Sequence, residues 1–357
     1  MALTKLTLSS LMCVTVLAAA PAYAQAPTYH VIELNEVTGA TPCVATAIND
    51  GGTTVGSCTQ PLAATVTAAA WAGTRRTNLG MLPFGHYAMA TAINSLGVIV
   101  GDGDAGDWQP RPFVTYKGKL LNIDPSGGAN MRAVGIMDNG TIFGNYAKGL
   151  SGNTSSWSPV YYLPEPGKPD RYRRYELPRV PGGDSKSNGA YANASNQAGQ
   201  VVGWVQNSLF GQRGAFWDNN ATHSVVVLDP IAGSNQSIAW AVNDLGQAVG
   251  TSWIPFVGDR AVMWDNDAEH TAIDLGTLPG DVTSTAVGAN AAGQVVGVST
   301  SSTNDRRAFL YGLGAMGEAG VTKALEIIHK ELDLSMAFCG RTDINTVDKS
   351  ILLPGTY

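Results

Sequence analysis

Three carboxylates stand close together in the first third of the chain and suggest a cation site. Asp102, Asp104 and Asp107 lie in a glycine-containing stretch, residues 101–107. Carboxylate oxygens are the hard ligands that calcium prefers, and a short loop can direct several of them at one ion. This stretch lacks the remaining ligands and the terminal glutamate of a complete calcium loop. Two interpretations therefore stay open, a weak calcium site and a solvated turn.

The other residues of catalytic type form no recognisable active site. None of the five histidines lies in the close pairs that bind zinc. No G-x-S-x-G phrase is present. Serine, histidine and aspartate are numerous, but their spacing singles out neither a catalytic triad nor a glycosidase-type carboxylate pair. We expect no metal and no catalytic residues in this chain, and a hydrolase remains an alternative.

Two of the four cysteines are placed to form a disulfide. Residues 49–52, Asn-Asp-Gly-Gly, are a strong turn signal. Cys43 and Cys58 are equidistant from the centre of that turn, so a hairpin would bring them face to face. We predict a disulfide between them, with two small buried side chains as the alternative. Cys339 is then left as a free thiol.

A phrase of the form I-N-x-x-G-x-V-V-G recurs six times, and Met137 replaces the asparagine in the third copy. The closing glycines are 43 to 59 residues apart. Repeats of this length bury their apolar faces only against neighbouring repeats. Asparagine and glycine suit the unusual backbone conformations of hairpin turns. The predicted turn residues are Asn49, Gly52, Gly56, Asn94, Gly97, Gly101, Gly140, Gly144, Asn196, Gly199, Gly203, Asn243, Gly246, Gly250, Asn290, Gly293 and Gly297.

Each repeat contains four short strand candidates, and the last ends in an aromatic residue in most copies. Four strands with regularly placed glycines and aromatics are typical of a β-propeller blade. We predict an all-β fold over residues 25–311, a β-propeller-like array of six four-stranded repeats. A β-solenoid of stacked hairpins is the alternative. The proline-rich segment 150–176 is predicted to be a surface insertion. The repeats are predicted at 28–73, 74–118, 119–167, 168–219, 220–266 and 267–311.

Further phrases accompany the repeats. Gly-Ala-Phe-Trp stands at 214–217, Arg-Ala-Phe-Leu-Tyr at 307–311 and Asp-Leu-Gly-Thr-Leu at 274–278. With them, residues 28–311 resemble the extracellular HAF-repeat proteins, named for a His-Ala-Phe phrase. The resemblance implies secretion and a repeat fold, and it implies no defined activity.

The amino terminus and the charge balance indicate an exported protein. Residues 1–24 contain Lys5, an apolar stretch and Ala-Tyr-Ala, which fits a signal peptide cleaved before Gln25. No later stretch is long and apolar enough to span a membrane. The net charge of −6 argues against nucleic acid as a partner. We expect a secreted or periplasmic protein that is not membrane-bound after signal removal.

The tail, residues 312–357, has a different character. Residues 321–332 have apolar side chains at helix spacing and predict one amphipathic α-helix followed by an irregular tail. The phrases over 307–343 resemble the end of FMN-dependent α-hydroxy-acid dehydrogenases, the family of lactate dehydrogenases and glycolate oxidases. That resemblance implies FMN and matches Arg307 to the family's phosphate-contacting arginine. The family's catalytic residues come from earlier barrel strands that have no counterpart here, so we expect no cofactor. We hypothesise a gene fusion or a misassembly at residues 307–311.

These observations favour a secreted repeat scaffold that binds a surface protein or a glycan. Two enzyme functions remain as alternatives. One is a propeller-type hydrolase, and the other is an FMN-dependent 2-hydroxy-acid oxidoreductase, implied by the tail alone.

Overall fold

The structure, a computed structural model, describes residue 34 and residues 42–60, 65–125, 130–147, 157–180, 189–207 and 211–311. The chain divides into two units, residues 1–33 and residues 34–357. The predicted signal peptide and the tail with its predicted helix lie outside the described residues. So do Cys339 and the segment 148–156.

The described residues form 23 strands and no helix. They make six antiparallel sheets, each built from consecutive strands; five have four strands and the sixth has three described strands. Sheet one is β1 (Cys43–Ile48), β2 (Thr53–Thr59), β3 (Val66–Ala72) and β4 (Arg75–Gly80). Sheet two is β5 (Ala88–Ile93), β6 (Ile99–Gly103), β7 (Arg111–Tyr116) and β8 (Lys119–Asn122). Sheet three is β9 (Met131–Ile136), β10 (Ile142–Ala147), β11 (Trp157–Glu165) and β12 (Lys168–Glu176). Sheet four is β13 (Gly189–Ser195), β14 (Val201–Asn207), β15 (Gly211–Trp217) and β16 (Val225–Leu228). Sheet five is β17 (Gln236–Val242), β18 (Ala248–Ile254), β19 (Gly258–Trp264) and β20 (Ala272–Gly276). Sheet six is β21 (Asp281–Ala289), β22 (Val295–Ser301) and β23 (Arg306–Tyr311).

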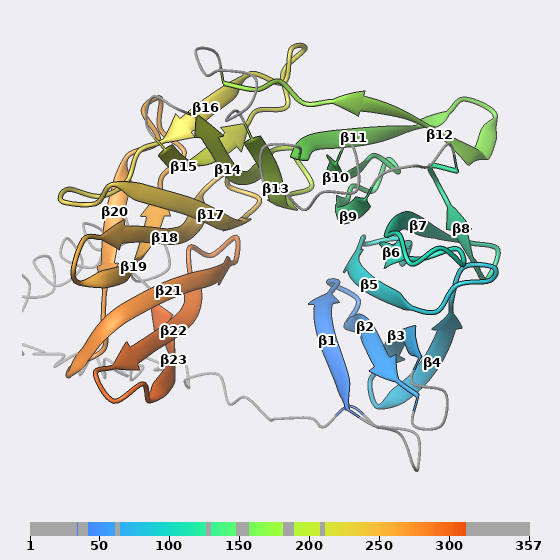
Figure 1. Cartoon of the computed structure of the whole chain (residues 1–357), viewed down its shortest axis with the longest axis horizontal. Coiled ribbons are helices and arrows are strands. Elements are labelled where there is room, and N and C mark those ends of the chain that lie inside the picture. The colour runs from blue at the N-terminus through green and yellow to red at the C-terminus, as the bar shows by residue number, and fades with distance from the viewer. Residues whose placement is uncertain are drawn as a thin grey trace, which may run out of the picture. The chain divides into compact units, whose positions relative to one another are not determined.

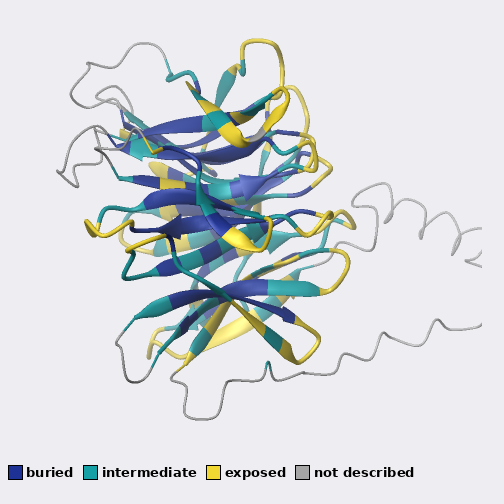
Figure 2. Cartoon of the chain, turned by 90° about the vertical axis from the view of Figure 1, so that its right-hand side faces the viewer, coloured by how far each residue is buried: buried dark blue, intermediate teal, exposed yellow. Residues whose placement is uncertain are grey.

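Consecutive sheets pack against each other, most regularly through their first strands: β1 contacts β5, β5 contacts β9, and the series continues to β21. Figure 1 shows the six sheets following one another in chain order. The apolar cores lie between neighbouring sheets, as in the cluster that contains Phe216 of sheet four and Trp264 of sheet five. Buried segments are concentrated in the strands and exposed ones in the turns (Figure 2). This is the predicted all-β, β-propeller-like array of repeats.

The predicted turn residues have the expected conformations. Gly52, Gly97, Gly140, Gly199, Gly246 and Gly293 have φ between +72° and +85°, where a side chain is strained. The side-chain oxygen of each repeat asparagine accepts a hydrogen bond from the backbone N–H four residues later, as from Val98 to Asn94 at 2.8 Å. In the third copy, Asn139 accepts the corresponding bond from Thr141, which compensates for Met137.

The strands fall into sheets differently from the predicted repeats. The predicted sixth repeat, 267–311, begins with residues 272–278, but β20 over Ala272–Gly276 is the last strand of sheet five. The same shift places β4 in sheet one, outside the predicted repeat 28–73. A period fixes the length of a repeat and does not show which strand begins the sheet.

The predicted insertion is part of the fold. Residues 157–176 form β11 and β12, two nine-residue strands of sheet three. Val160 and Tyr162 of β11 are buried in the core. The prolines are accommodated within these strands, and the carbonyl of Pro159 still accepts a hydrogen bond from the N–H of Leu177 at 2.9 Å.

Candidate functional site

The repeat builds one row of the scaffold from small residues. In sheets two to six, a buried alanine of the first strand lies opposite the closing glycine of the second strand. In each of these sheets a bulge follows the alanine. A Cβ on the glycine would overlap the carbonyl oxygen of the first strand, as Gly203 would meet that of Tyr191. This alanine–glycine row is the same in sheets two to six. It fixes the backbone of the adjacent row of residues on the same two strands.

The adjacent row changes from sheet to sheet. It holds the residue after the closing glycine and its partner on the first strand. In sheets one, five and six the pairs are Val44 with Ser57, Ile238 with Thr251, and Thr285 with Val298. In sheets two, three and four they are Met89 with Asp102, Arg132 with Asn145, and Tyr191 with Trp204. Charged residues in this row occur in sheets two and three alone, and aromatic residues in sheet four.

We call Asp102, Arg132, Asn145, Tyr191 and the nearby Tyr87 the inter-sheet cluster, because the first strands of sheets two, three and four pack together here. Asn145 connects two of these sheets. Its side chain donates to the carbonyl of Ala192 and accepts from the N–H of the same residue, both at 2.7 Å. The amide thereby fixes β10 against β13.

Asp102 is the unusual member of the cluster. Its side chain belongs to a residue that is only 3% exposed, and among the described residues its Oδ2 atom has no hydrogen-bond partner. Burial raises the pKa of Asp102 to about 6, and the charge of Arg132 opposes the rise. A buried acceptor without a partner costs free energy, and a ligand hydroxyl or amide could supply the missing bond.

The two tyrosines respond to the same environment. Burial raises the pKa of Tyr87, and the negative charge of Asp102 adds to the rise. Burial also raises the pKa of Tyr191, while the charge of Arg132 lowers it. Both hydroxyls therefore stay protonated over the physiological range and can donate hydrogen bonds.

Aromatic rings from sheets three and four border the cluster. Trp157 meets Tyr191 edge to face at a centroid distance of 5.3 Å, and Trp204 stacks on Tyr191 at 6.0 Å. All three residues are half-buried. Such rings present an apolar face while their polar atoms can still bind. The cluster thus combines a carboxyl, a guanidinium, hydroxyls and an aromatic surface.

The three aspartates of the calcium hypothesis do not converge on one ion. Asp104 is fully buried, and its carboxylate accepts bonds from the backbone N–H groups of His86 and Tyr87 and from His86 Nδ1 at 2.7 Å. Burial acts to raise the pKa of Asp104, but these hydrogen bonds outweigh it and hold the pKa far below its usual value. Asp107 pairs with Arg111.

Within the described residues no three His, Cys, Asp or Glu side chains are grouped to hold a metal. The calcium interpretation therefore does not fit, and neither does the solvated turn for Asp102 and Asp104, which are buried. Their burial comes from sheet packing that a local phrase does not reveal. Next to them, Trp108 stacks on His86 at 4.1 Å and is 65% exposed.

The predicted disulfide is present. Cys43 and Cys58 lie directly opposite each other on β1 and β2 with an S–S distance of 2.06 Å. The bond lies in sheet one, outside the inter-sheet cluster, and ties the first strand to the second.

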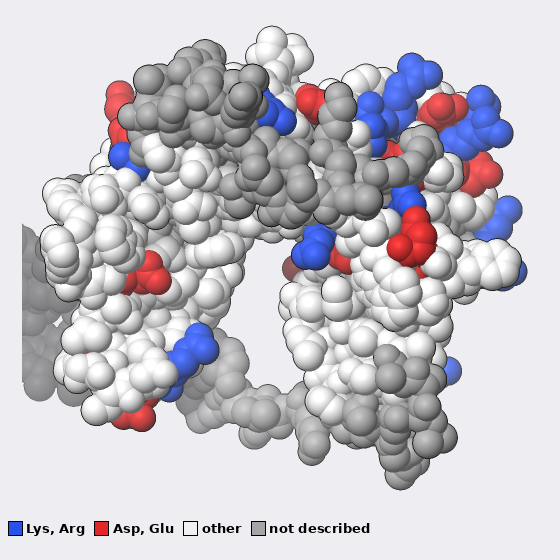
Figure 3. Space-filling view, viewed as in Figure 1, with Lys and Arg blue, Asp and Glu red and all other residues white. Residues whose placement is uncertain are grey.

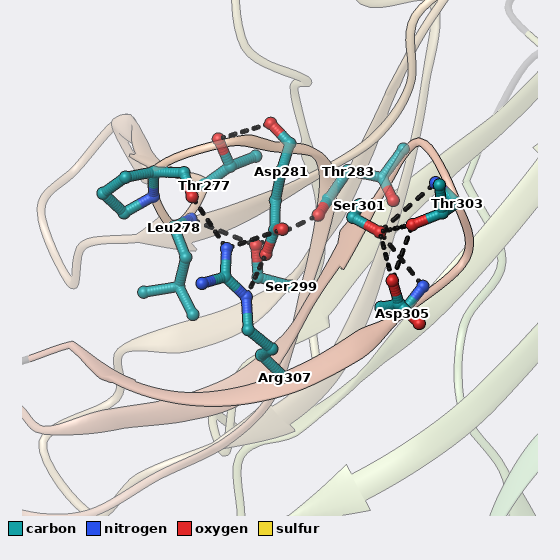
Figure 4. A network of polar contacts seen from close by, with 10 residues as sticks. Thr277, Leu278, Asp281, Thr283, Ser299, Ser301, Thr303, Asp305 and Arg307 are labelled. Atoms are coloured by element: carbon teal, nitrogen blue, oxygen red, sulfur yellow. Dashed lines mark hydrogen bonds and ion pairs between the residues drawn. The ribbon is translucent and has the colours of Figure 1, made fainter.

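Arg307, the residue matched to a flavin phosphate contact, already has a partner in the propeller. Its guanidinium binds the carboxylate of Asp281 at 2.7 Å and donates to the carbonyl of Pro279 at 2.8 Å (Figure 4). The hydrogen bond from Arg307 is the leading cause that lowers the pKa of Asp281. A phosphate would have to compete with this carboxylate, so the described residues do not fit FMN.

The sequence alone missed most of the cluster. Arg132, Tyr191, Trp204 and Tyr87 match no catalytic phrase. The available signal was the comparison among repeats: the position after each closing glycine and its partner on the first strand hold a different residue type in each of the six sheets.

Charged side chains on the face shown in Figure 3 gather over β11 and β12, and the face of β17 to β23 carries few. In that region Arg174 pairs with Asp124 at 2.7 Å and lies over the ring of Tyr146 at 4.0 Å. Arg174 is therefore engaged within the fold. No helix of the described residues is long and apolar enough to cross a membrane.

Comparison with known sequences finds similarity in the tail. A family model for FMN-dependent dehydrogenase matches residues 305–354. L-lactate dehydrogenases from Caulobacter vibrioides (strain NA1000 / CB15N) and Caulobacter sp. (strain K31) are 46% and 44% identical to this chain over 46 residues. The match covers 13% of this chain and 12% of these relatives. Most of the matched residues lie outside the described part.

Comparison with solved structures concerns the repeat region. A prolyl endopeptidase is similar over 76% of this chain and 41% of its own, with a TM-score of 0.52 and 7% identity. The β-propeller domain of the Trilobed protease from Pyrococcus furiosus has a TM-score of 0.41 at 11% identity, over 77% of this chain and 95% of its own. An Aleuria aurantia lectin has a TM-score of 0.39 at 14% identity, over 78% of this chain and 93% of its own. At these identities the similarity concerns the fold alone.

Proposed function

We propose that this chain is a secreted binding module of the HAF-repeat type, and that its ligand is a cell-surface glycan bound at the inter-sheet cluster. The observation that carries the proposal is the unpartnered Oδ2 of Asp102, buried beside the exposed Arg132. A hydroxyl-rich ligand would complete the bonding of Asp102, and Arg132 would contact an acidic group. The half-buried rings of Tyr191 and Trp204 supply an apolar surface for a sugar ring.

Export is part of this proposal. Disulfides persist in oxidising compartments, so the bond between Cys43 and Cys58 supports a periplasmic or extracellular location. Amino-terminal sequencing of the protein from culture medium and periplasm should find Gln25 as the first residue. An uncleaved protein in the cytoplasm would contradict it.

Binding is tested on an array of bacterial surface glycans with the full chain, Arg132→Ala and Asp102→Asn. Thr285→Ala is the matched control, because Thr285 occupies in sheet six the position that Arg132 occupies in sheet three. We expect the first two variants to lose at least about tenfold in affinity, as loss of a buried or charged contact typically causes. Equal binding by all four proteins, or none by the wild type, would overturn the proposal; a surface protein as the ligand is one such outcome.

A hydrolase at the same cluster is the second candidate, favoured by one observation. A carboxyl with a pKa near 6 suits general acid catalysis near neutral pH. Fluorogenic glycosides and esters test it. Turnover that disappears in Asp102→Asn would replace the binding function by catalysis.

A further inference from the structure

We propose that a cavity in sheet five is a second binding site, independent of the inter-sheet cluster, for one ring of a neutral sugar. We call it the sheet-five pocket. Its volume is about 260 Å³, near the lower end of ligand pockets, roughly 300–1,000 Å³, which suits a single ring. It is lined by Gln212, Gln236, Ser237, Ile238, Thr251, Trp253 and Asp259.

Two sheets build the pocket. Trp253 of β18 lies directly opposite Gln236 of β17 and Asp259 of β19, so the three occupy one row across three strands. Cross-strand partners in a row share one face of a sheet. Gln212 comes from β15 of sheet four. The walls therefore belong to regular strands, which hold side chains more firmly than loops do.

Three of the polar side chains that line the pocket have free hydrogen-bonding capacity, and two do not. The two are Ser237, whose Oγ donates to the carbonyl of Leu228 at 2.8 Å, and Thr251, whose Oγ1 accepts from Trp240 at 2.9 Å. The side chains of Gln212, Gln236 and Asp259 make no hydrogen bond to another described residue. Two amides and a carboxyl together offer donors and acceptors in planar pairs, which matches the adjacent hydroxyls of a sugar.

Trp253 supplies the apolar wall. It is 38% exposed, although it lies in a strand whose preceding five residues are buried. The negative face of an indole attracts weakly positive hydrogens, such as the C–H groups on one face of a hexose. A small pocket with one exposed indole face and three vacant polar groups therefore fits a sugar ring better than an apolar ligand.

Charge selects a neutral sugar. No lysine or arginine lines the pocket among the described residues, and Asp259 is its acidic group. A uronate or sialate carboxyl would meet Asp259 without a compensating cation. The inter-sheet cluster, with Arg132, has the opposite preference, so the two sites are distinguishable by ligand.

The test measures tryptophan fluorescence and calorimetric titration of the full chain. The probes are the methyl glycosides of glucose, galactose, mannose, fucose and N-acetylglucosamine, with glucuronate as the charged control. We expect saturable binding of at least one neutral glycoside and none of glucuronate at this site. Trp253→Ala and Gln236→Ala should each weaken binding at least about tenfold, the size expected for a central contact.

Three controls keep the result interpretable. Trp108→Ala removes another exposed indole from sheet two and should leave the affinity unchanged. Failure of the proposed inter-sheet function is read separately, with Arg132→Ala on the surface-glycan array. Circular dichroism of each variant checks folding, and Gln236→Ala serves if Trp253→Ala does not fold. Absence of saturable binding by the wild type, or wild-type affinity in both pocket variants, would overturn the proposal.

Discussion

Two aspartates, two positions apart, have opposite effects on stability. Burial raises the pKa of Asp102 to about 6, above the ordinary value of 3.8. Between about pH 4 and 6 the folded protein therefore binds more protons than the unfolded chain, and the free energy of unfolding falls as pH rises. Asp102→Asn removes the titrating carboxyl, so the free energy of unfolding of the variant should not fall with pH in this way. The variant should therefore become increasingly more stable than the wild type as pH rises from about 4 to 6. The gain should reach roughly 2–3 kcal/mol at pH 7, measured by urea unfolding from pH 4 to 8.

Asp104→Asn is the control, because the carboxylate of Asp104 should affect stability in the opposite direction from that of Asp102. Hydrogen bonds from His86 and the backbone hold the pKa of Asp104 below its ordinary value despite its burial. Its carboxylate therefore stabilises the fold above the unfolded pKa, and this contribution is lost as pH falls. The variant should be less stable than the wild type at pH 7, and the difference should shrink below pH 4. Parallel pH profiles for both variants would refute this assignment.

The closing glycines are needed for close approach of the strands. Gly203→Ala would place a Cβ on the carbonyl oxygen of Tyr191, and the strands would have to separate. Overpacking of this kind typically costs about 1–3 kcal/mol. Gly51→Ala is the matched control, since a Cβ there would meet only the Asn49 side chain at 3.4 Å or more. Chemical denaturation should show a large loss for the first variant and a small one for the second.

The sequence predicted these residues unevenly. The turn glycines and the cysteine pair follow from local spacing, because a hairpin relates residues close in the chain. The state of Asp102 depends on Arg132 and on packing against sheet three, some 30 residues later. A local phrase holds no information on such packing, and the same three aspartates therefore suggested calcium.

At the scale of the elements, asparagines link successive sheets. The amide of Asn243 donates to the carbonyl of Asn290 at 2.9 Å, and Asn49, Asn94 and Asn196 make the equivalent bond to the next repeat. Met137 has no side-chain amide. Between sheets three and four the side-chain amide of Gln197 instead donates to the carbonyl of Ile136 at 3.2 Å. The repeated asparagine thus closes a turn and joins two sheets.

Asn243→Asp separates these two roles. Aspartate keeps the oxygen that accepts from the N–H of Gln247 and loses the amide, which donates to the carbonyl of Asn290 and to the side-chain oxygen of Gln247. The residue is 4% exposed, so an unsatisfied carbonyl beside a buried charge should cost about 1–3 kcal/mol. Asn290→Asp is the control, because Asn290 is exposed and its amide bonds within its own turn. Equal losses in denaturation experiments would contradict the linking role.

The disulfide stabilises sheet one by closing a hairpin. Cys43 and Cys58 are 15 residues apart, and a loop of this length contributes roughly 3 kcal/mol in the chain-entropy model. The double variant Cys43→Ser, Cys58→Ser should lose about that amount in oxidising buffer. The wild type should lose a similar amount when reductant is added, and the double variant should not respond. An equal response of both proteins to reductant would assign the effect elsewhere.

For the whole molecule, the period of the sequence predicted the number and order of the sheets but not where each begins. A repeat of about 47 residues contains four strands whichever strand is counted first, because the chain continues directly from one unit into the next. The grouping depends on which strand crosses to the neighbouring sheet, and β20 pairs with β19 rather than with β21. Pairing between strands is a property of the folded molecule.

The tail gives the last prediction, which concerns the identity of the whole chain. The FMN-dependent dehydrogenase match covers residues 305–354, while a flavin site in such a barrel needs loops from several strands. The described residues form sheets of consecutive antiparallel strands, and Arg307 is held by Asp281. We therefore expect the full chain, after incubation with excess FMN and gel filtration, to show no flavin absorbance. Arg307→Ala should lower the stability of the fold and leave the absorbance unchanged. Stoichiometric FMN that disappears in Arg307→Ala would instead establish a flavin site at the junction of β23 and the tail.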